Sequence, residues 1–406
     1  MTDQYPSTAV LIEPASVPTQ DDLVTRAAEL RETLWTDAPE ADRERRLTER
    51  SVAAISDAGL TRLMTARRYG GFETDVRTVL DVVTELGRGC GSSAWVTAVY
   101  NSGNFMVGQF PDETRPDVWG DNPGARVALV LAPPKASVEL VDGGIVMTGT
   151  WGYASGSLHS DWIGLVVPVP TQDKPVPHLA LVPMSDLTVK DTWLVTGMRG
   201  TGSNTVAAER VFVPRHRMLP WLPLVEGERF TDHPDEILYR TSVSGVLQVF
   251  LLGAMIGEAQ AALSYVLEKA PGRAIASSTY ASQKESVAFQ IDVADAATMI
   301  DTAQLHAIRI ADTVDRSARL GEQLDIPARA RLRMDAAHTV RTCREAIDLL
   351  MTAHGTSAFA EFSPLQRIWR DVSMGSRHGG FGARIPQEVY GRAMLGLDPR
   401  KTSYLL

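Results

Sequence analysis

Apolar residues recur at spacings of three and four through four stretches near the N-terminus, residues 23–34, 51–64, 78–86 and 93–103. This period places the apolar side chains of each stretch on one face of a helix with 3.6 residues per turn. Glycines separate the later stretches and punctuate the pattern. We therefore expect an N-terminal domain made of helices.

The pattern changes after Pro111 to short runs rich in Val, Leu and Thr. Residues 137–140 and 145–149 flank Asp142-Gly143-Gly144, a turn sequence typical of a β-hairpin. Further runs of the same kind continue to Val213. Several short strands separated by turn residues indicate a small antiparallel barrel or sandwich, and we expect a central antiparallel β-barrel domain.

The helical period returns after Pro214. Helices are expected over residues 246–269, 287–308, 332–350 and 385–396, which together predict a C-terminal four-helix bundle. The second of these helices is predicted from the apolar face formed by Val287, Ile291, Ala294, Thr298, Leu305 and Ile308.

Helices followed by strands and then by helices define an α+β chain. Its expected parts are an irregular tail over 1–20, an N-terminal helical domain over 21–120, a β-domain over 121–225 and a four-helix bundle over 226–406.

Composition narrows the function. The 406 residues have a formal net charge of −9, so nucleic acid is not an expected partner. Cys90 and Cys343 are predicted to be separate buried apolar residues, and the eight histidines show no metal-ligand spacing. The N-terminus has no signal-peptide pattern, and apolar stretches such as Val243–Ile256 are too short or interrupted to span a bilayer. We expect a soluble, cytoplasmic protein that does not bind membranes.

Thr150–Ser157 is the first of three segments that stand out chemically. Trp151 and Tyr153 are two apart on a predicted strand, so their side chains are expected on the same side. With Ser155 they could form a flat aromatic wall and a hydroxyl for a planar ring. The alternative is a core tryptophan followed by a polar turn.

The other two segments are Gly197–Ser203 and the stretch that ends at His378. Three glycines in the former could let backbone N–H groups approach a ligand, although a solvated loop is equally compatible. Arg367 and Arg370 share a helix face and could grip a phosphate, while Asp371 could form a surface salt bridge. A histidine just before two glycines could reach a cofactor, but a lone histidine is more often structural.

Five motifs in register resemble the acyl-CoA dehydrogenase superfamily over roughly residues 20 to 400. They are Arg68–Phe72, Gly91–Trp95, Thr150–Ser157, Gly197–Ser203 and Arg367–His378. Within that superfamily the chain looks like the two-component flavin-dependent monooxygenases. Around the usual position of the dehydrogenase's catalytic glutamate it has Arg-His-Gly-Gly and no Tyr-Glu-Gly.

The resemblance implies a role for each matching residue. Trp95, Leu129 and Leu131 would line the flavin site, and Trp151, Tyr153 and Ser155 would contact the isoalloxazine ring. The phosphates would be bound by Arg273 and by Arg367 or Arg370, and Gly355 and Thr356 would lie by the flavin of a neighbouring protomer. His378 would stand near flavin C4a, with Ser155 as the second catalytic candidate, and Tyr100, Asn101 and Asn104 are the candidates for the substrate side.

The resemblance also implies the chemistry and the partners. Reduced FAD or FMN, supplied by a separate NAD(P)H-dependent flavin reductase, would react with O₂ to give a C4a-hydroperoxide that hydroxylates a small aromatic or indole-like compound. Such enzymes are typically homotetramers. The alternatives are an N-oxygenase of an amine or amino sugar, an acyl-CoA dehydrogenase, and a non-catalytic scaffold.

Overall fold

The computed structural model describes residues 17–132, 134–403 and 405–406, so most of the predicted tail lies outside the described residues. The N-terminal helices are α1 (Gln20–Glu29), α2 (Arg31–Glu44), α3 (Glu49–Asp57), α4 (Val76–Gly87), α5 (Gly91–Val107) and α6 (Arg115–Trp119). Side-chain caps begin several of them; for example, the hydroxyl of Thr19 accepts from the N–H of Asp22. The predicted apolar face is confirmed, since Leu23, Ala27 and Leu34 are fully buried.

The central domain consists of two four-stranded sheets rather than one closed barrel. One sheet has the order β1-β4-β5-β8 and the other β2-β3-β7-β6. The strands are β1 (Val127–Val130), β2 (Lys135–Val141), β3 (Gly144–Ala154), β4 (Trp162–Val169), β5 (Val176–Pro183), β6 (Thr188–Lys190), β7 (Asn204–Pro214) and β8 (Met218–Pro220). All pairs are antiparallel except β1 with β4. The predicted hairpin joins β2 to β3, and Gly143 supplies its left-handed residue at φ 75°.

Strand β1 lies between two hydrophobic cores because side chains alternate across a strand. Ala128 and Val130 belong to the core between the two sheets. Val127 packs into the helical core, and the partly buried Leu129 and Leu131 lie against that core. The sheet that contains β1 therefore presents an apolar face to the helices.

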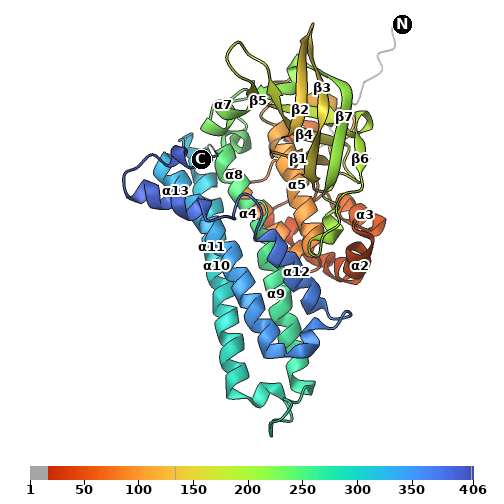
Figure 1. Ribbon diagram of the computed structural model, residues 1–406, viewed down its shortest axis with the longest axis vertical. Coiled ribbons are helices and arrows are strands. Elements are labelled where there is room, and N and C mark those ends of the chain that lie inside the picture. The colour runs from red at the N-terminus through yellow and green to blue at the C-terminus, as the bar shows by residue number, and fades with distance from the viewer. Residues whose placement is uncertain (1–16, 133, 404) are drawn as a thin grey trace, which may run out of the picture.

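The C-terminal part is helical, with one change from the expected bundle. Its helices are α7 (Trp221–Glu226), α8 (Val243–Val249), α9 (Leu252–Lys269), α10 (Val287–Leu320), α11 (Ile326–His354), α12 (Pro364–Gly375) and α13 (Ile385–Met394). The predicted fourth helix is present as α13, but it packs on α11, whereas α12 lies against both α9 and α11. Helices α9 to α12 thus form the long bundle that extends away from the β-domain (Figure 1).

The apolar face predicted for α10 does not face the core. Val287, Ile291 and Leu305 are each more than half exposed. The core side of the same helix is lined by Ala296, Ile300, Ala303, Ala307, Ile310, Ala311 and Val314. The sequence period therefore predicted the helix correctly, but the apolar residues expected in the core of the bundle are mostly exposed at its surface.

Two further expectations concern apolar segments. Val243–Gly272 is long and apolar enough to cross a membrane by length and composition, contrary to the sequence estimate, but 78% of its most apolar window is buried inside the protein. The segment comprises α8 and α9, whose buried apolar residues belong to the helical core. Cys90 and Cys343 are both buried and free, as predicted.

Candidate active site

Three predicted residues that are far apart in the sequence meet beside α5. The indole N–H of Trp95 donates to Oγ of Ser155 at 3.3 Å. The rings of Trp95 and His378 are 5.6 Å apart between centroids and nearly perpendicular. Helix α12 ends directly against them, because a Cβ on Gly375 would lie only 3.3 Å from Cζ3 of Trp95. We call Trp95, Ser155 and His378 the Ser155 site.

The turn that carries Ser155 corrects the prediction of an aromatic wall. A bulge interrupts the pairing of β3 with β7 between Trp151 and Ala154, and Tyr153 has a left-handed backbone with φ 62°. The two aromatic side chains consequently do not share a side. Trp151 is 1% exposed and donates to the carbonyl of Val166 in the core between the sheets, whereas Tyr153 is 72% exposed. The alternative of a core tryptophan and a polar turn describes the structure.

Hydroxyl groups continue from Ser155 into the neighbouring loop. Oγ of Ser155 lies 2.7 Å from Oγ of Ser203, which lies 2.7 Å from Oγ1 of Thr201. Thr201 donates to the carbonyl of Met198 at 2.8 Å. The sequence singled out this loop for its glycines, but it gave no sign that the hydroxyls of Thr201 and Ser203 form one chain with Ser155.

His378 lies on the loop after α12 in a defined tautomer. Its Nδ1 accepts from the backbone N–H of Gly380 at 3.2 Å, so the proton of the neutral ring is on Nε2. The side chain of His378 is exposed to solvent in the single chain, but desolvation by the protein around it still lowers its pKa. The ring is therefore neutral at neutral pH, and its accessible nitrogen is a hydrogen-bond donor.

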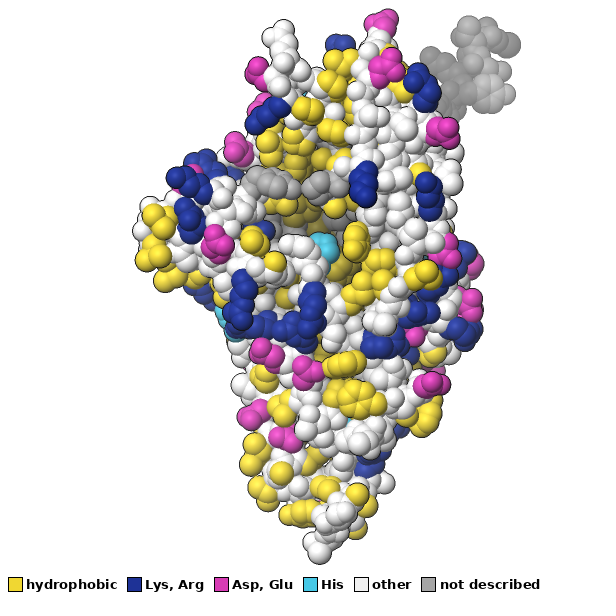
Figure 2. Space-filling model, viewed as in Figure 1, with side chains coloured by type: hydrophobic (Ala, Val, Ile, Leu, Met, Phe, Trp, Pro, Cys, Tyr) yellow, Lys and Arg dark blue, Asp and Glu magenta, His cyan; other side chains and the backbone are white. Residues whose placement is uncertain are grey.

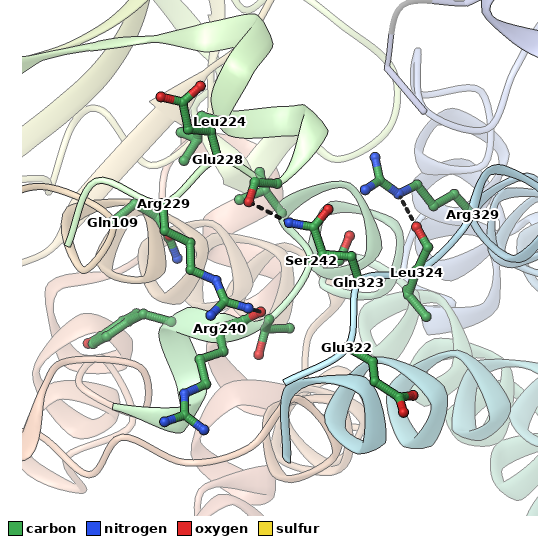
Figure 3. A pocket seen from close by; sticks show the side chains of 14 residues that line it. Gln109, Leu224, Glu228, Arg229, Arg240, Ser242, Glu322, Gln323, Leu324 and Arg329 are labelled. Atoms are coloured by element: carbon green, nitrogen blue, oxygen red, sulfur yellow. Dashed lines mark hydrogen bonds between the residues drawn. The ribbon is translucent and has the colours of Figure 1, made fainter. Parts of the chain in front are cut away.

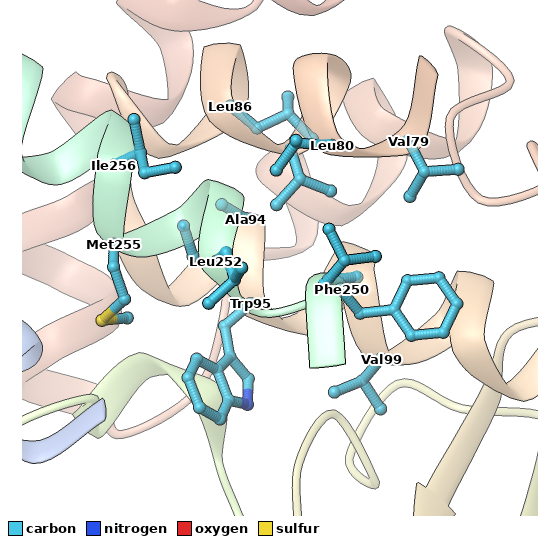
Figure 4. Close-up of a cluster of buried hydrophobic side chains, with 14 of the residues drawn as sticks. Val79, Leu80, Leu86, Ala94, Trp95, Val99, Phe250, Leu252, Met255 and Ile256 are labelled. Atoms are coloured by element: carbon cyan, nitrogen blue, oxygen red, sulfur yellow. The ribbon is translucent and has the colours of Figure 1, made fainter. Parts of the chain in front are cut away.

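Apolar side chains surround these polar groups. Trp95 and Val99 lie at the margin of the buried cluster, on the side away from Leu80 and Leu86 (Figure 4). Figure 2 shows a hollow between the β-domain and the bundle, with hydrophobic side chains above it and a histidine inside it. Leu129, predicted to line this site, is partly buried on the sheet face that packs on the helical core.

The three candidates for the substrate side do not share the hollow. Asn101 and Asn104 are fully buried, and their amides donate to the backbone carbonyls of Leu60, Thr97, Thr61 and Ala125. Tyr100 donates to the carbonyl of Gly156 at 2.8 Å, and burial raises its pKa. A phenol held protonated in this way is no base; it braces the turn that carries Ser155.

The arginines of α12 are committed to the protein itself. Arg370 makes a bidentate pair with Asp42 at 3.1 and 2.9 Å and also donates to the carbonyl of Thr196. Arg367 is buried, with its guanidinium 5.9 Å from the ring centroid of Trp35. Asp371 forms no surface salt bridge, since it is buried and accepts from the N–H of Met198; burial raises its pKa to about 6.

The remaining predicted residues gather at the end of the bundle that points away from the β-domain (Figure 1). Arg273 donates to the carbonyl of His354 at 2.9 Å and to Oγ of Ser357 at 2.6 Å. Gly355 and the exposed Thr356 lie between these two partners in the sequence. We call Arg273, Gly355 and Thr356 the tip cluster.

A second hollow, between α7, α8 and the start of α11, is polar. Gln323 donates to the carbonyl of Gly227, Arg229 to that of Arg240 and Arg329 to that of Leu324 (Figure 3). These three side chains are bound to backbone carbonyls, whereas the buried amide nitrogen of Gln109 on the same wall has no hydrogen-bond partner among the described residues. The Ser155 site is the better candidate for chemistry because it brings a hydroxyl, an indole and an imidazole together.

Comparisons with known proteins agree with this architecture. The acyl-CoA dehydrogenase N-terminal domain matches residues 18–114, and the acyl-CoA dehydrogenase C-terminal domain matches residues 250–382. The oxygenase subunit HsaA of a flavin-dependent monooxygenase from Mycobacterium tuberculosis is 31% identical over 368 residues, which are 88% of this chain and 91% of the relative. The oxygenase component of an FADH(2)-dependent resorcinol hydroxylase from Rhizobium sp. is 27% identical, with 96% and 97% covered.

A solved structure gives the same result. XiaF from Streptomyces sp., in complex with FADH2 and glycerol, matches with a TM-score of 0.88 and 37% identity over 94% of this chain and 96% of that one. The chain belongs to the acyl-CoA dehydrogenase superfamily and, within it, to the oxygenase components of two-component flavin-dependent monooxygenases. It uses reduced flavin made by a separate reductase component, which excludes the dehydrogenase and scaffold alternatives.

The residues of the Ser155 site fit a reduced flavin ring. Oγ of Ser157, on the same turn, is buried without a hydrogen-bond partner among the described residues, so it is free to bond to a ligand. The partly buried Leu129 and Leu131 pack against the same apolar cluster as Trp95. When bound there, reduced flavin supplies the electrons that activate O₂.

Proposed function

We propose that the enzyme hydroxylates a small aromatic or indole-like compound at the Ser155 site, as part of secondary metabolism in the cytoplasm. The observation that carries this proposal is the chemistry of the walls: indole, aliphatic and phenyl groups lie beside a few serine and threonine hydroxyls and one neutral imidazole, with no charged side chain among the residues named for the site. An amino sugar needs several polar contacts, which the amides of Asn101 and Asn104 do not supply because they are engaged in the core.

The names of several relatives point the same way. The Rhizobium relative is a resorcinol hydroxylase, and a Pseudomonas putida relative with 27% identity is an indole-3-acetate monooxygenase. Both names describe aromatic substrates. We therefore propose a substrate from the class of phenols and indoles.

Each residue of the site has a role in this proposal. Trp95 and its apolar neighbours would limit the access of water to the ring, which would favour transfer of oxygen over release of hydrogen peroxide and would strengthen short polar contacts. His378 donates through Nε2 to the oxygen that is transferred or to the product hydroxyl. Ser155 holds the N5 edge of the ring in place.

We further propose that the assembly is a homotetramer in which a second copy completes the cofactor site. The tip cluster is remote from the Ser155 site within one chain, and the exposed apolar stripe of α10 offers a surface for another copy. In this arrangement Arg273, Gly355 and Thr356 of one protomer bind the phosphates of the flavin whose ring lies in its neighbour. Arg370, predicted for that task, is neutralised by the carboxylate of Asp42, and Arg367 is buried beside Trp35. Arg273 donates only to neutral oxygens in the hydrogen bonds given for it among the described residues.

The test supplies enzymatically reduced flavin, ¹⁸O₂ and a panel of phenols and indoles to the wild type and to His378→Ala. We expect a singly ¹⁸O-labelled hydroxylated product from the wild type. In the variant the loss of the Nε2–H donor should lower product formation by roughly 100-fold and release hydrogen peroxide instead. Equal product yields from both proteins would remove His378 from the mechanism. Oxidation of amines together with inertness toward every aromatic would replace the proposal with N-oxygenation.

A further inference from the structure

The hydroxyl chain at the Ser155 site can be oriented in only one way. It begins at the indole of Trp95, which has an N–H donor and no acceptor, and ends at the carbonyl of Met198, which has only acceptor lone pairs. Between these ends stand three hydroxyls with one proton each: Ser155, Ser203 and Thr201.

Counting protons from the carbonyl end assigns every bond. Thr201 donates its only hydroxyl proton to the carbonyl of Met198, so its oxygen must accept the hydrogen bond from Ser203. Ser203 has then spent its own proton and must accept from Ser155. Ser155 in turn accepts from Trp95, which agrees with the direction required at the other end. The only hydrogen-bonding capacity that Ser155 retains is one acceptor lone pair.

The backbone around the chain holds Ser155 in place. The N–H of Gly156 donates to the carbonyl of Thr201 at 2.9 Å, which ties the two loops together. Tyr100 donates to the carbonyl of Gly156 from the other side. Ser155 and Ser203 are both buried, so bulk water does not compete for these hydroxyls.

A fixed acceptor distinguishes the two oxidation states of a flavin. The N5 atom of the reduced ring bears a hydrogen and donates, whereas N5 of the oxidised ring has a lone pair and can only accept. Resting on the proposed placement of the ring against Ser155, we propose that Thr201 and Ser203 are positioning residues that fix the Ser155 hydroxyl as an acceptor, so that the site selects reduced over oxidised flavin.

Such selection suits an enzyme that receives its cofactor by diffusion. The reductase partner releases reduced flavin, and oxidised flavin is left over at the end of every turnover. An acceptor beside N5 forms a hydrogen bond with reduced flavin. With oxidised flavin its lone pair faces the lone pair of N5, and that hydrogen bond is not made, which weakens binding. We expect this cost to change the ratio of the two dissociation constants by roughly tenfold.

The test measures that ratio by anaerobic titration of reduced and oxidised FAD into the full-length enzyme. Thr201→Val frees the proton of Ser203, and Ser203→Ala frees the proton of Ser155; in either variant Ser155 can turn and donate to oxidised N5. Both variants should lose about tenfold of the preference for reduced flavin, chiefly by binding oxidised FAD more tightly. Preferential binding of the reduced form raises the reduction potential of the flavin. A tenfold loss of that preference should leave the potential of the variant-bound flavin about 30 mV below that of the wild type.

Two control variants distinguish an effect of hydrogen-bond direction from a non-specific change in the structure of the site. Thr201→Ser keeps the hydroxyl chain and should retain the wild-type ratio. Thr205→Val removes a hydroxyl at the start of β7 that pairs with Thr192 and takes no part in the hydroxyl chain, so it should also leave the ratio unchanged. An unchanged ratio in Thr201→Val and Ser203→Ala, or an equal loss in Thr205→Val, would overturn the inference. If the wild type bound neither form of flavin, the proposed ring site itself would fall instead.

Discussion

The Ser155 site and the tip cluster differ in how complete they are within one chain. At the Ser155 site, α5, the end of β3 and the loop after α12 converge, and each polar atom of the hydroxyl chain has a partner. At the tip cluster, Thr356 is exposed, and Phe362, six residues further on, is 92% exposed. The fold of a single chain completes the contacts of the Ser155 site, whereas the tip cluster has side chains exposed for contact with another molecule.

The difference indicates where folding ends and assembly begins. Buried hydroxyls and a tryptophan are held by long-range contacts that form as the chain folds. The apolar stripe of α10 and the tip cluster acquire neighbours only when copies meet. Flavin affinity should therefore depend on assembly, whereas the geometry around Ser155 should not.

The largest effect is expected from breaking the assembly. Replacing Ile291 and Leu305 together by aspartate puts two charges on the exposed stripe of α10, where burial against a second copy would cost several kcal/mol. Analytical ultracentrifugation should show a smaller species, with FAD affinity reduced by at least roughly 100-fold. Leu140→Asp, on an equally exposed leucine of β2, is the matched control. An unchanged mass and affinity in the double variant would mean that the stripe is not an interface.

A smaller effect is expected from the tip cluster alone. Arg273→Ala removes the cation that we propose binds a phosphate, and charge-assisted hydrogen bonds contribute about 1.5–3 kcal/mol. Affinity for reduced FAD should fall by roughly tenfold or more, as measured by anaerobic titration. Riboflavin, which has no phosphate, should bind both proteins equally. An equal loss for riboflavin would show that Arg273 supports the fold of the tip rather than a phosphate.

The smallest effect separates the two regions by pH. Because the pKa of His378 in the folded protein is below the ordinary value, the unfolded chain binds a proton first as pH falls below about 6.5, and stability declines between that point and the lower pKa of the folded state. Hydroxylation should share this acid limb, since protonation breaks the bond from Gly380 to Nδ1. In the folded protein His354, beside the tip cluster, should become protonated only near its pKa of about 4, although it too lowers stability below about pH 6.5 because the unfolded chain binds its proton first. Hydroxylation, and not stability, therefore separates the two regions by pH. If the rate of hydroxylation fell at acid pH in His378→Gln as it does in the wild type, His378 would not be the group responsible.

Much of this fold could be predicted from local patterns, and the exceptions share one cause. Helical periods, the β2–β3 hairpin and the buried face of α1 follow from neighbouring residues. The environment of the α10 stripe does not, because a period says nothing about which molecule covers it. The opposite directions of Trp151 and Tyr153 depend on a bulge set by pairing with β7, about fifty residues away in the sequence.

The candidate site was predicted unevenly for the same reason. Trp95, Ser155 and His378 were identified by motif, and the structure brings them together. Asn101 and Asn104 have a suitable residue type, but their amides are used by backbone carbonyls of distant loops. The roles of Ser203 and Thr201 depend on the order of bonds in a chain that only coordinates reveal.

The most direct test is a crystal structure of the enzyme with reduced FAD bound under anaerobic conditions. We predict that N5 of the ring lies within hydrogen-bonding distance of Oγ of Ser155, about 3 Å, with His378 on the open face and the phosphates against Arg273 from a second copy. A ring bound elsewhere in the assembly, with Ser155 still joined only to Trp95 and Ser203, would contradict the account.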